Sequence, residues 1–231
     1  MITNDKFRPL VLGFIGKAKA GKDTAANDFQ ELMDGIVPIY RKPFAGPIRE
    51  IGKLFGYTME QMTDQSLKET YCNKIFPLVT PRKFMQLVGS EMFRNNLDKD
   101  CWVKLVKNFI EGEYDKASHY VTIIEDGKYR PSSIVMITDV RFPNEAAMIK
   151  EMGGYLIKIT RPSLAQDGAD WHKHESEAYI DTIEADFNTV NDMDTAVGWG
   201  RMFSYRIVKW LGEQGWELNI DKERWIVNSP S

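Results

Sequence analysis

Gly16-Lys17-Ala18-Lys19-Ala20-Gly21-Lys22-Asp23-Thr24 follows an apolar run from Leu10 to Ile15 and precedes an amphipathic helix. The spacing reads G-x-x-x-x-G-K. Glycines allow a tight turn in which successive backbone N–H groups face a polyphosphate, and the lysine reaches the outer phosphates. The other interpretation is a glycine-rich turn that binds nothing. The strand and the helix on either side favour a phosphate-binding loop at residues 16–24.

The residue after the loop lysine is Asp23, where this kind of loop normally has a Ser or Thr that touches magnesium. A carboxylate beside a triphosphate is repelled unless a cation lies between them. Two interpretations therefore stay open. Asp23 either helps to hold Mg²⁺, through water, or points aside and complements the helix N-terminus. Thr24 is then the leading hydroxyl for the metal or for an inner phosphate.

The composition is that of an ordinary globular protein. The 231 residues suit one α/β domain, 1–231, and the net charge of −3 carries no polyelectrolyte signature, so nucleic acid is not expected as a partner. No apolar run approaches the roughly eighteen residues of a membrane span, and no signal peptide is recognisable, so we expect a cytoplasmic protein without membrane contact. Cys72 and Cys101 have no zinc-site spacing and are expected to be buried thiols.

Hydrophobic periodicity predicts alternating strands and helices, and hence a parallel sheet with helices on both faces. The expected strands are 10–15, 37–40, 134–137, 155–159 and 187–191, and the expected helices are 24–34, 44–55, 80–95, 102–110, 143–152 and one that packs Trp199, Phe203, Ile207 and Trp210. Asp126-Gly127 predicts a hairpin over 120–127 and beyond. Thr58 with Gln61, and Thr80 before Pro81, have the pattern of helix caps. In helix 44–55 the spacing predicts burial of Ile48, Ile51 and Leu54.

Three charged residues follow the carboxyl ends of predicted strands. A carboxylate at that edge of the sheet, here Asp139, is suited to orient magnesium through water, although a strand-end Asp is as often a cap or turn residue. Arg141 leaves the same edge, where a guanidinium can stabilise the charge on a moving phosphoryl group. Arg161 is a second candidate for that role, at the base of an expected flap, and its alternative is a surface ion pair.

The helix that starts at Pro81 places Arg82 and Gln86 one turn apart, with Gly89 beside them. An arginine could hold a phosphate there, and an amide could read a base edge. Glu91 falls on the apolar face, which indicates either a misjudged helix length or a buried, partnered carboxylate. Arg94 and Trp102 could form a stacking wall, although a tryptophan there is more often core.

Histidines and glutamates at 172, 174, 175 and 177 suggest a metal cluster only superficially. Histidines two residues apart diverge on a helix, and no thiolate joins them, so substrate contact or flap closure is the favoured interpretation.

The chain resembles the deoxynucleoside monophosphate kinases of tailed bacteriophages, P-loop enzymes related in fold to nucleoside monophosphate kinases and dephospho-coenzyme A kinases. The resemblance covers most of the chain and rests on five segments: Gly16 to Thr24; Phe44-Ala45-Gly46-Pro47-Ile48-Arg49; Thr80-Pro81-Arg82 with Gln86, Gly89, Glu91, Arg94 and Trp102; Asp139-Val140-Arg141-Phe142-Pro143-Asn144-Glu145; and His174-Glu175-Ser176-Glu177. The Asp-Val-Arg-Phe-Pro-Asn-Glu run is the most diagnostic after the loop.

The resemblance implies a P-loop kinase fold, with a helical acceptor-binding region over about 44–112 and a flap over about 161–177. It also implies ATP as phosphoryl donor, Mg²⁺ as cofactor and a deoxynucleoside monophosphate as acceptor. The catalytic residues would be Lys22, Arg141, Arg161 and Asp139, and the metal would lie near Asp23, Thr24 and Asp139. The acceptor would meet Phe44, Ala45, Arg49, Arg82, Gln86, Arg94, Trp102, His174 and Glu177.

Three functions compete at this stage. The first is phosphoryl transfer from ATP to deoxynucleoside monophosphates, the second a kinase for another acceptor such as dephospho-coenzyme A, and the third a P-loop regulatory or nucleotide-binding module. A GTPase switch is disfavoured because Asn73-Lys74 is followed by Ile75-Phe76, which is not the Asn-Lys-x-Asp base-recognition motif. The accepted bases, the discrimination against ribose and the formation of a homodimer are left open.

Overall fold

The computed structural model describes residues 7–118, 128–163, 179–192 and 196–220 of the chain. They divide into two compact units, one formed by residues 1–42 with 107–231 and the other by residues 43–106. The expected hairpin at 120–127 and most of the expected flap lie outside the described residues. No helix in the described ranges is long and apolar enough to cross a membrane.

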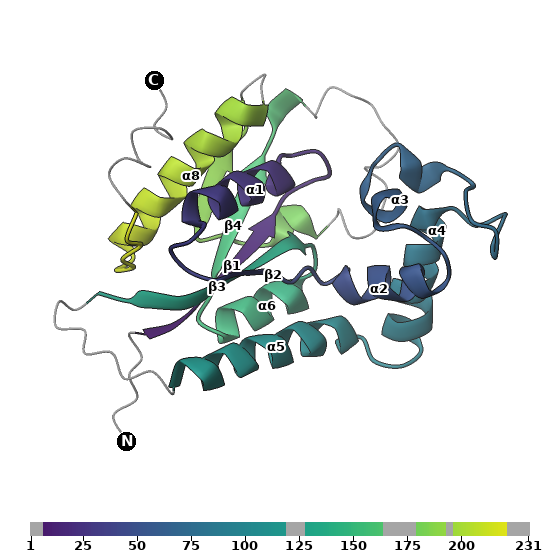
Figure 1. Ribbon diagram of the computed structural model, residues 1–231, viewed down its shortest axis with the longest axis horizontal. Coiled ribbons are helices and arrows are strands. Elements are labelled where there is room, and N and C mark those ends of the chain that lie inside the picture. Colours follow the sequence, from purple (N-terminus) through teal and green to yellow (C-terminus); the bar gives the residue numbers. More distant parts are fainter. Residues whose placement is uncertain (1–6, 119–127, 164–178, 193–195, 221–231) are drawn as a thin grey trace. The chain divides into compact units, whose positions relative to one another are not determined.

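The first unit is built on a five-stranded sheet in the order β2-β3-β1-β4-β5 (Figure 1). All neighbouring strands are parallel, which confirms the predicted sheet. β1 is central, and the expected edge strand near Asn191 is present as β5. The strands are β1 Phe7–Ile15, β2 Ile39–Arg41, β3 Arg130–Val140, β4 Tyr155–Thr160 and β5 Phe187–Val190.

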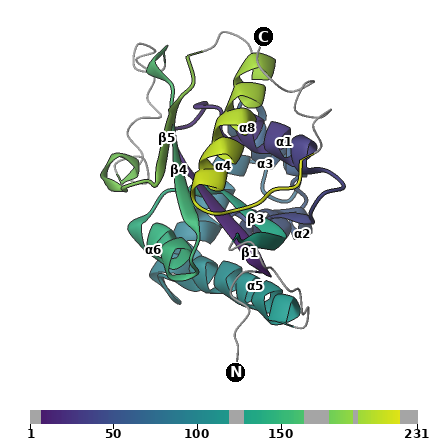
Figure 2. The same cartoon turned by 90° about the vertical axis from the view of Figure 1, so that its left-hand side faces the viewer.

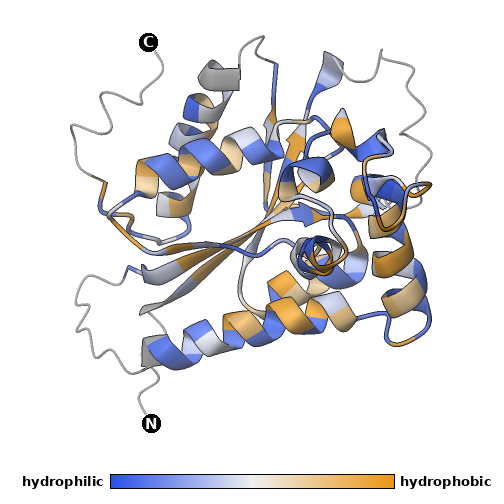
Figure 3. Ribbon diagram, turned by 45° about the vertical axis from the view of Figure 1, so that its right-hand side comes forward, coloured by the Kyte–Doolittle hydropathy of each residue, from blue (hydrophilic) through white to orange (hydrophobic). Residues whose placement is uncertain are grey.

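Helices cover both faces of this sheet, as predicted. α1 (Lys22–Met33) and α8 (Ala196–Glu213) lie together on one face, and α6 (Pro143–Glu151) lies on the other, as Figure 2 shows. α5 (Cys101–Ser118) shares the face of α6, where Phe109 packs edge-on against Tyr40 of β2 with ring centroids 5.4 Å apart. Blue and orange alternate along α5 in Figure 3, as an amphipathic helix requires. This is the P-loop kinase fold.

Alternation along β1 distributes its side chains between the two helical layers. Leu10, Leu12 and Phe14 enter the core formed with α1 and α8. Gly13 faces α6, where a Cβ would lie 2.5 Å from Ile149 Cδ1, so a larger residue there would force the Ile149 side chain to move. In α8 the predicted core residues Trp199, Phe203 and Ile207 are fully buried, whereas Trp210 is half-buried and contacts Tyr155 edge-on and Phe187 at a tilt, at the starts of β4 and β5.

The second unit consists of short helices joined by turns. They are α2 Gly46–Leu54, α3 Met59–Thr63, the 3₁₀ turn η1 Leu67–Glu69, α4 Pro81–Gln86 and the π-helical η2 Leu87–Asn95. Both predicted caps are confirmed. Gln61 and Thr58 form a reciprocal capping box, and the Thr80 hydroxyl accepts a hydrogen bond from the Lys83 N–H at 3.2 Å. Gly56 ends the α2 segment with a φ of 86°.

Leu54 was expected in the core but is 83% exposed. α2 buries the face that carries Ile48 and Gly52, four residues apart. A Cβ on Gly52 would collide with Met62 Sδ, so α2 lies directly against its neighbours through backbone at that point. The face of α2 that carries Leu54 points to solvent. The prediction that Leu54 belongs to the buried face was therefore wrong.

Two further expectations are corrected in the second unit. Glu91 is neither buried nor at a helix end, because the helix becomes π-helical after Gln86 and its wider turn rotates Glu91 to the surface, 3.7 Å from Lys83 Nζ. Cys72 is exposed and Cys101 only half-buried, and both are free thiols. Burial raises the pKa of the Cys101 thiol, although nearby backbone hydrogen bonds oppose that shift.

Candidate active site

The loop between β1 and α1 has the backbone of a phosphate-binding turn. Lys19 and Gly21 adopt positive φ angles of 62° and 102°, and the Ala20 N–H donates to Lys17 O at 3.2 Å. At Gly16 a Cβ would lie 2.5 Å from the carbonyl oxygen of Ile159 in β4, so only glycine fits beside that strand. The loop ends at the first turn of α1, where helix N–H groups favour an anion.

Lys22 is folded back over this loop. Its ammonium donates to Gly16 O at 2.6 Å and to Lys17 O at 2.8 Å. Both acceptors are uncharged carbonyls of the loop itself. The charge of Lys22 is therefore fixed beside the N–H groups that would cradle a phosphate, which is the position that the sequence predicts for it.

Two side chains that are distant from the loop in sequence, Asn191 and Trp199, donate hydrogen bonds to its carbonyl groups. Asn191, just after β5, donates from Nδ2 to Ala20 O at 3.1 Å, and Trp199 of α8 donates from Nε1 to Gly21 O at 3.3 Å. Both residues are buried. A Cβ at Gly21 would lie 2.7 Å from each of these nitrogens, so the loop packs on them without clearance. The carbonyl oxygens of Ala20 and Gly21 therefore accept hydrogen bonds from within the protein, and a ligand would meet the N–H groups of the loop.

Asp23 and Thr24 lie on the first turn of α1, Asp23 exposed and Thr24 half-buried. Asp23 also interacts electrostatically with Arg41, the last residue of β2. Burial lowers the pKa of the Arg41 guanidinium, and the Asp23 carboxylate opposes that shift. The sequence did not indicate Arg41 as a site residue.

Asp139 and Arg141 lie where the sequence places them, at the carboxyl end of β3 next to the end of β1. Val140 pairs with Ile15, the residue that precedes the loop. The buried carboxylate of Glu145 accepts hydrogen bonds from the backbone N–H groups of Arg141 and Phe142, at 2.8 and 3.1 Å. Glu145 thus fixes the turn that carries Arg141 at the start of α6.

Arg161 follows β4, the other neighbour of β1 in the sheet. Its Nε donates to the Ser163 hydroxyl at 3.2 Å. Nearby in the first unit, Lys17 of the loop forms an ion pair of 3.4 Å with Asp181, in the 3₁₀ turn η5 Ile180–Thr182. His174 and Glu177, the expected flap contacts, lie outside the described residues.

In the second unit, three of the expected acceptor residues, Arg82, Arg94 and Trp102, already have partners. Arg82 Nε forms a close ion pair with Glu69, and Arg82 Nη2 lies 3.4 Å from Gln65 Oε1. Gln86 is half-buried one turn further along the helix. Arg94 donates from Nε to Lys99 O at 3.3 Å. Trp102 is 6% exposed, donates from its indole nitrogen to Gly89 O at 2.9 Å and packs on Phe93, as a core tryptophan does.

The start of α2 holds the remaining expected acceptor residues. Phe44 is buried, and Ala45 occupies the N-cap position of the helix. Arg49 is half-buried, and its Nε has no hydrogen-bond partner in the part of the chain that the structure describes. Arg82 and Arg49 therefore differ, since an acidic side chain neutralises the first while the Nε of the second lacks an acceptor.

Comparison with known proteins bears on the whole arrangement. A family model for deoxynucleotide monophosphate kinases matches residues 57–196. A protein of Acanthamoeba polyphaga mimivirus, provisionally named as a deoxynucleotide monophosphate kinase, is 36% identical over 179 residues, which are 76% of this chain and 84% of the viral protein. The chain belongs to the deoxynucleotide monophosphate kinase family. The resemblance noted in the sequence is thereby confirmed.

In this family member the matched range contains most of the second unit and the Asp139 to Glu145 segment, but begins after the phosphate loop. The loop is therefore supported independently, by its spacing and its backbone geometry. Within the described ranges no group of three or more His, Cys, Asp or Glu side chains is placed to hold a metal ion.

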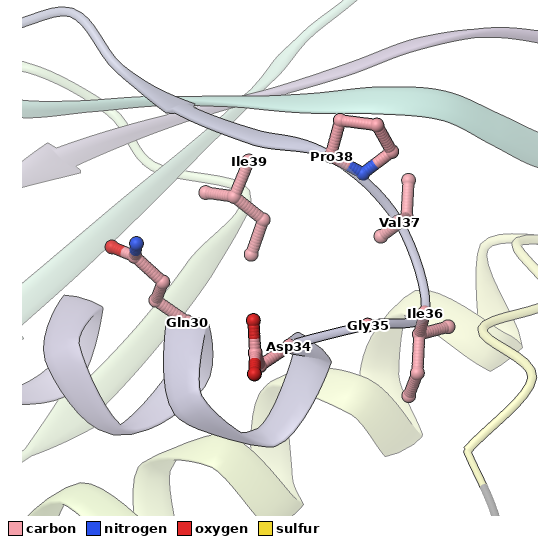
Figure 4. A pocket seen from close by; sticks show the side chains of 7 residues that line it. All are labelled: Gln30, Asp34, Gly35, Ile36, Val37, Pro38 and Ile39. Carbon is pink, nitrogen blue, oxygen red and sulfur yellow. The ribbon is translucent and has the colours of Figure 1, made fainter.

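A cavity of about 410 Å³ lies elsewhere in the first unit, between the end of α1 and the start of β2 (Figure 4). Its lining is Gln30, Asp34, Gly35, Ile36, Val37, Pro38 and Ile39. α1 has 12 residues, so this cavity is ~18 Å along the helix from the loop. It contains no loop residue and is separate from the candidate active site.

Proposed function

We propose that this protein transfers the γ-phosphoryl group of ATP to deoxynucleoside 5′-monophosphates and so produces the diphosphates for DNA precursor synthesis. The observation that carries the proposal is the geometry of the loop at Gly16 to Thr24. The Lys22 ammonium donates to two carbonyls of this loop, and the side chains of Asn191 and Trp199 donate to two others. The family supplies the acceptor class, and the loop geometry supplies a place for a polyphosphate.

Lys22 is the principal charge in the proposed mechanism. Phosphoryl transfer spreads negative charge over the moving group, and a preorganised ammonium stabilises that charge at little reorganisation cost. Lys22 exchanges its carbonyl acceptors for outer phosphate oxygens when the nucleotide binds. The backbone N–H groups of the loop and of the first turn of α1 hold the inner phosphates.

Arg141 and Arg161 act from the two strands that flank β1. Their guanidinium groups would pair with phosphate oxygens in a forked geometry that lysine cannot reproduce. We assign Arg141 mainly to the transition state, because it leaves the sheet edge beside the end of β1. Arg161, at the base of the segment that precedes His174, would close over the phosphates.

Mg²⁺ fits the oxygen donors at this edge. Asp23 is exposed, Thr24 and Asp139 are half-buried, and carboxylate and hydroxyl oxygens are the ligands that the ion prefers. When bound, the ion would neutralise charge on the β- and γ-phosphates. Asp23 and Thr24 would hold it from the helix side and Asp139 from the strand side, in part through water.

The deoxynucleoside monophosphate would bind at the second unit. Arg82 would take its phosphate after leaving Glu69, and Gln86 would read the base edge. Phe44, Ala45, Arg49, Arg94 and Trp102 would shape the site around it, with His174 and Glu177 contributing from the flap. We place this activity in the cytoplasm, which would be the host cytoplasm if the gene is viral. The proposed kinase needs neither nucleic acid nor a membrane as a partner, and a homodimer would be compatible with its activity.

A panel assay tests this function. The purified chain is incubated with Mg-ATP and one acceptor at a time, and ADP formation is followed. The acceptors are the deoxynucleoside monophosphates, the ribonucleoside monophosphates and dephospho-coenzyme A. Turnover that depends on one or more deoxynucleoside monophosphates supports the proposal. Turnover with dephospho-coenzyme A alone would indicate another acceptor class, and slow ADP formation independent of any acceptor would indicate a regulatory or binding module.

A further inference from the structure

We propose that Arg41 is a phosphoryl-binding residue of the active site, an inference that rests on the proposed function. Arg41 lies outside the loop and outside every strand-end position that the sequence analysis selected. It ends β2, the edge strand next to β3, and thus stands at the carboxyl edge of the sheet. Ligands of open parallel sheets bind at that edge.

The register of the sheet directs Arg41 toward the helix that follows the loop. Arg41 pairs with Met136 of β3, which pairs in turn with Leu12 of β1, and both of these side chains belong to the core under α1 and α8. Tyr40, its neighbour in the strand, points the other way and packs on Phe109 of α5. Since side chains alternate along a strand, Arg41 lies on the α1 face, where Asp23 of the first turn interacts with it.

Two of the three guanidinium nitrogens of Arg41 lack acceptors in the part of the chain that the structure describes. Its Nε and Nη2 atoms are buried and have no hydrogen-bond partner among the described residues. Most buried N–H donors in proteins are paired, and a buried donor without a partner lowers the stability of the fold. A cation retained at such a cost beside a phosphate loop indicates a partner that arrives with the substrate.

A phosphoryl group is the partner whose chemistry fits. Arginine always carries its charge at physiological pH and offers its N–H groups as a planar fork that matches two phosphate oxygens. Asp23 alone does not meet this need, because it is exposed to water at the helix start. Among the described residues no acceptor fixes the two buried nitrogens, so their N–H groups are available to phosphate oxygens. The group is either a phosphate of the nucleotide on the loop or the phosphate of the acceptor.

The test compares wild type with Arg41→Met, which keeps the bulk of the stem and removes the fork. Arg206→Met on the exposed face of α8 is the matched control. Calorimetry is performed with three probes: a magnesium complex of a non-hydrolysable ATP analogue, inorganic tripolyphosphate, and a deoxynucleoside monophosphate. The Tm of each ligand-free protein is measured in parallel.

We expect Arg41→Met to bind at least one probe tenfold or more weakly, while its ligand-free Tm equals or exceeds that of wild type. Loss with the ATP analogue and tripolyphosphate assigns the donor phosphates, and loss with the monophosphate assigns the acceptor. Affinities that match Arg206→Met for all three probes overturn the proposal, as does weaker binding that accompanies a lower Tm, which would assign Arg41 to the fold.

If Arg41→Met does not fold, the same measurements are made on Arg41→Lys, which keeps the positive charge but lacks the planar N–H donors of the guanidinium group. A severalfold loss of affinity supports the proposal, and wild-type affinity overturns it. Failure of the proposed function has a different signature, because wild type itself would then bind neither the ATP analogue nor the monophosphate.

Discussion

Lys22 and Arg41 of the sheet unit have different partners from Arg82 of the helical unit, although both units contain further ion pairs, such as Lys17 with Asp181 in the first. In the sheet unit, Lys22 donates to carbonyls of its own loop, and two guanidinium nitrogens of Arg41 have no hydrogen-bond partner among the described residues. In the helical unit, Arg82 pairs with Glu69, Lys83 with Glu91 and Lys104 with Asp98. For the proposed kinase, this comparison predicts a donor side that is preformed for an anion, and an Arg82 that must exchange its ion pair with Glu69 for the substrate phosphate.

Lys22→Ala tests the preformed side with the largest expected effect. The turnover number should fall by about a hundredfold or more, as for other preorganised charges that act on a transition state. The fold should persist, because Lys22 touches loop carbonyls and is absent from the core. Steady-state kinetics and Tm are compared with Lys209→Ala, an exposed lysine of α8. A folded Lys22→Ala protein with normal turnover would refute the loop assignment.

The support behind the loop gives the next largest effect. Asn191→Ala and Trp199→Phe each remove one hydrogen bond to a loop carbonyl, worth about 1 kcal/mol, so the KM for ATP should rise about fivefold. The KM for the monophosphate should stay unchanged. Trp210→Phe, in the same helix but without a loop contact, is the control. If both KM values rise together, these residues stabilise the fold in general and do not position the loop.

The acceptor side predicts an effect of opposite sign. Glu69→Gln removes the charge that neutralises Arg82, so the monophosphate KM should fall by up to about fivefold, the range that exposed ion pairs allow. Arg82→Ala should raise that KM for every base alike, and Gln86→Ala should change the ranking among bases. ATP affinity is the internal control. The assignment of Arg82 fails if neither Glu69→Gln nor Arg82→Ala alters the monophosphate KM.

The smallest effect concerns stability of the sheet unit. Burial raises the pKa of Asp28, Glu31 adds to the shift and Arg201 opposes it. Because the folded-state pKa lies above the unfolded-state value, stability falls as the pH rises through that range. Asp28→Asn should therefore raise Tm at pH 7, and the gain should vanish below about pH 4. Equal Tm values for the two proteins at pH 7 would contradict this.

The sequence could predict features that depend on neighbouring residues. The loop follows from a nine-residue spacing, the caps at Thr58 and Thr80 from three-residue patterns, and the parallel sheet from alternating apolar segments. Each of these signals is local. The two caps and the parallel sheet were confirmed, although β2 is shifted to Ile39–Arg41 and β3 is longer than expected, and phosphate binding by the loop stays a prediction. The strand-end location of Asp139 and Arg141 follows in the same way, since parallel strands bring their carboxyl ends to one edge.

The features that escaped prediction depend on distant partners or on a change of helical period. Asn191 and Trp199 support the loop across 171 and 178 residues, and nothing near either residue signals that contact. Arg41 stood in a short edge strand, where only the register directs it to α1. Glu91 was misplaced because a 3.6-residue period was assumed through a π-helical segment.

The fate of the γ-phosphate tests the central claim most directly. The chain is incubated with ATP labelled in the γ-phosphate, Mg²⁺ and a deoxynucleoside monophosphate, and the products are separated by chromatography. The account predicts label in the deoxynucleoside diphosphate, in step with ADP formation, and loss of both products on addition of EDTA. Label released only as inorganic phosphate, with the monophosphate unchanged, would contradict it.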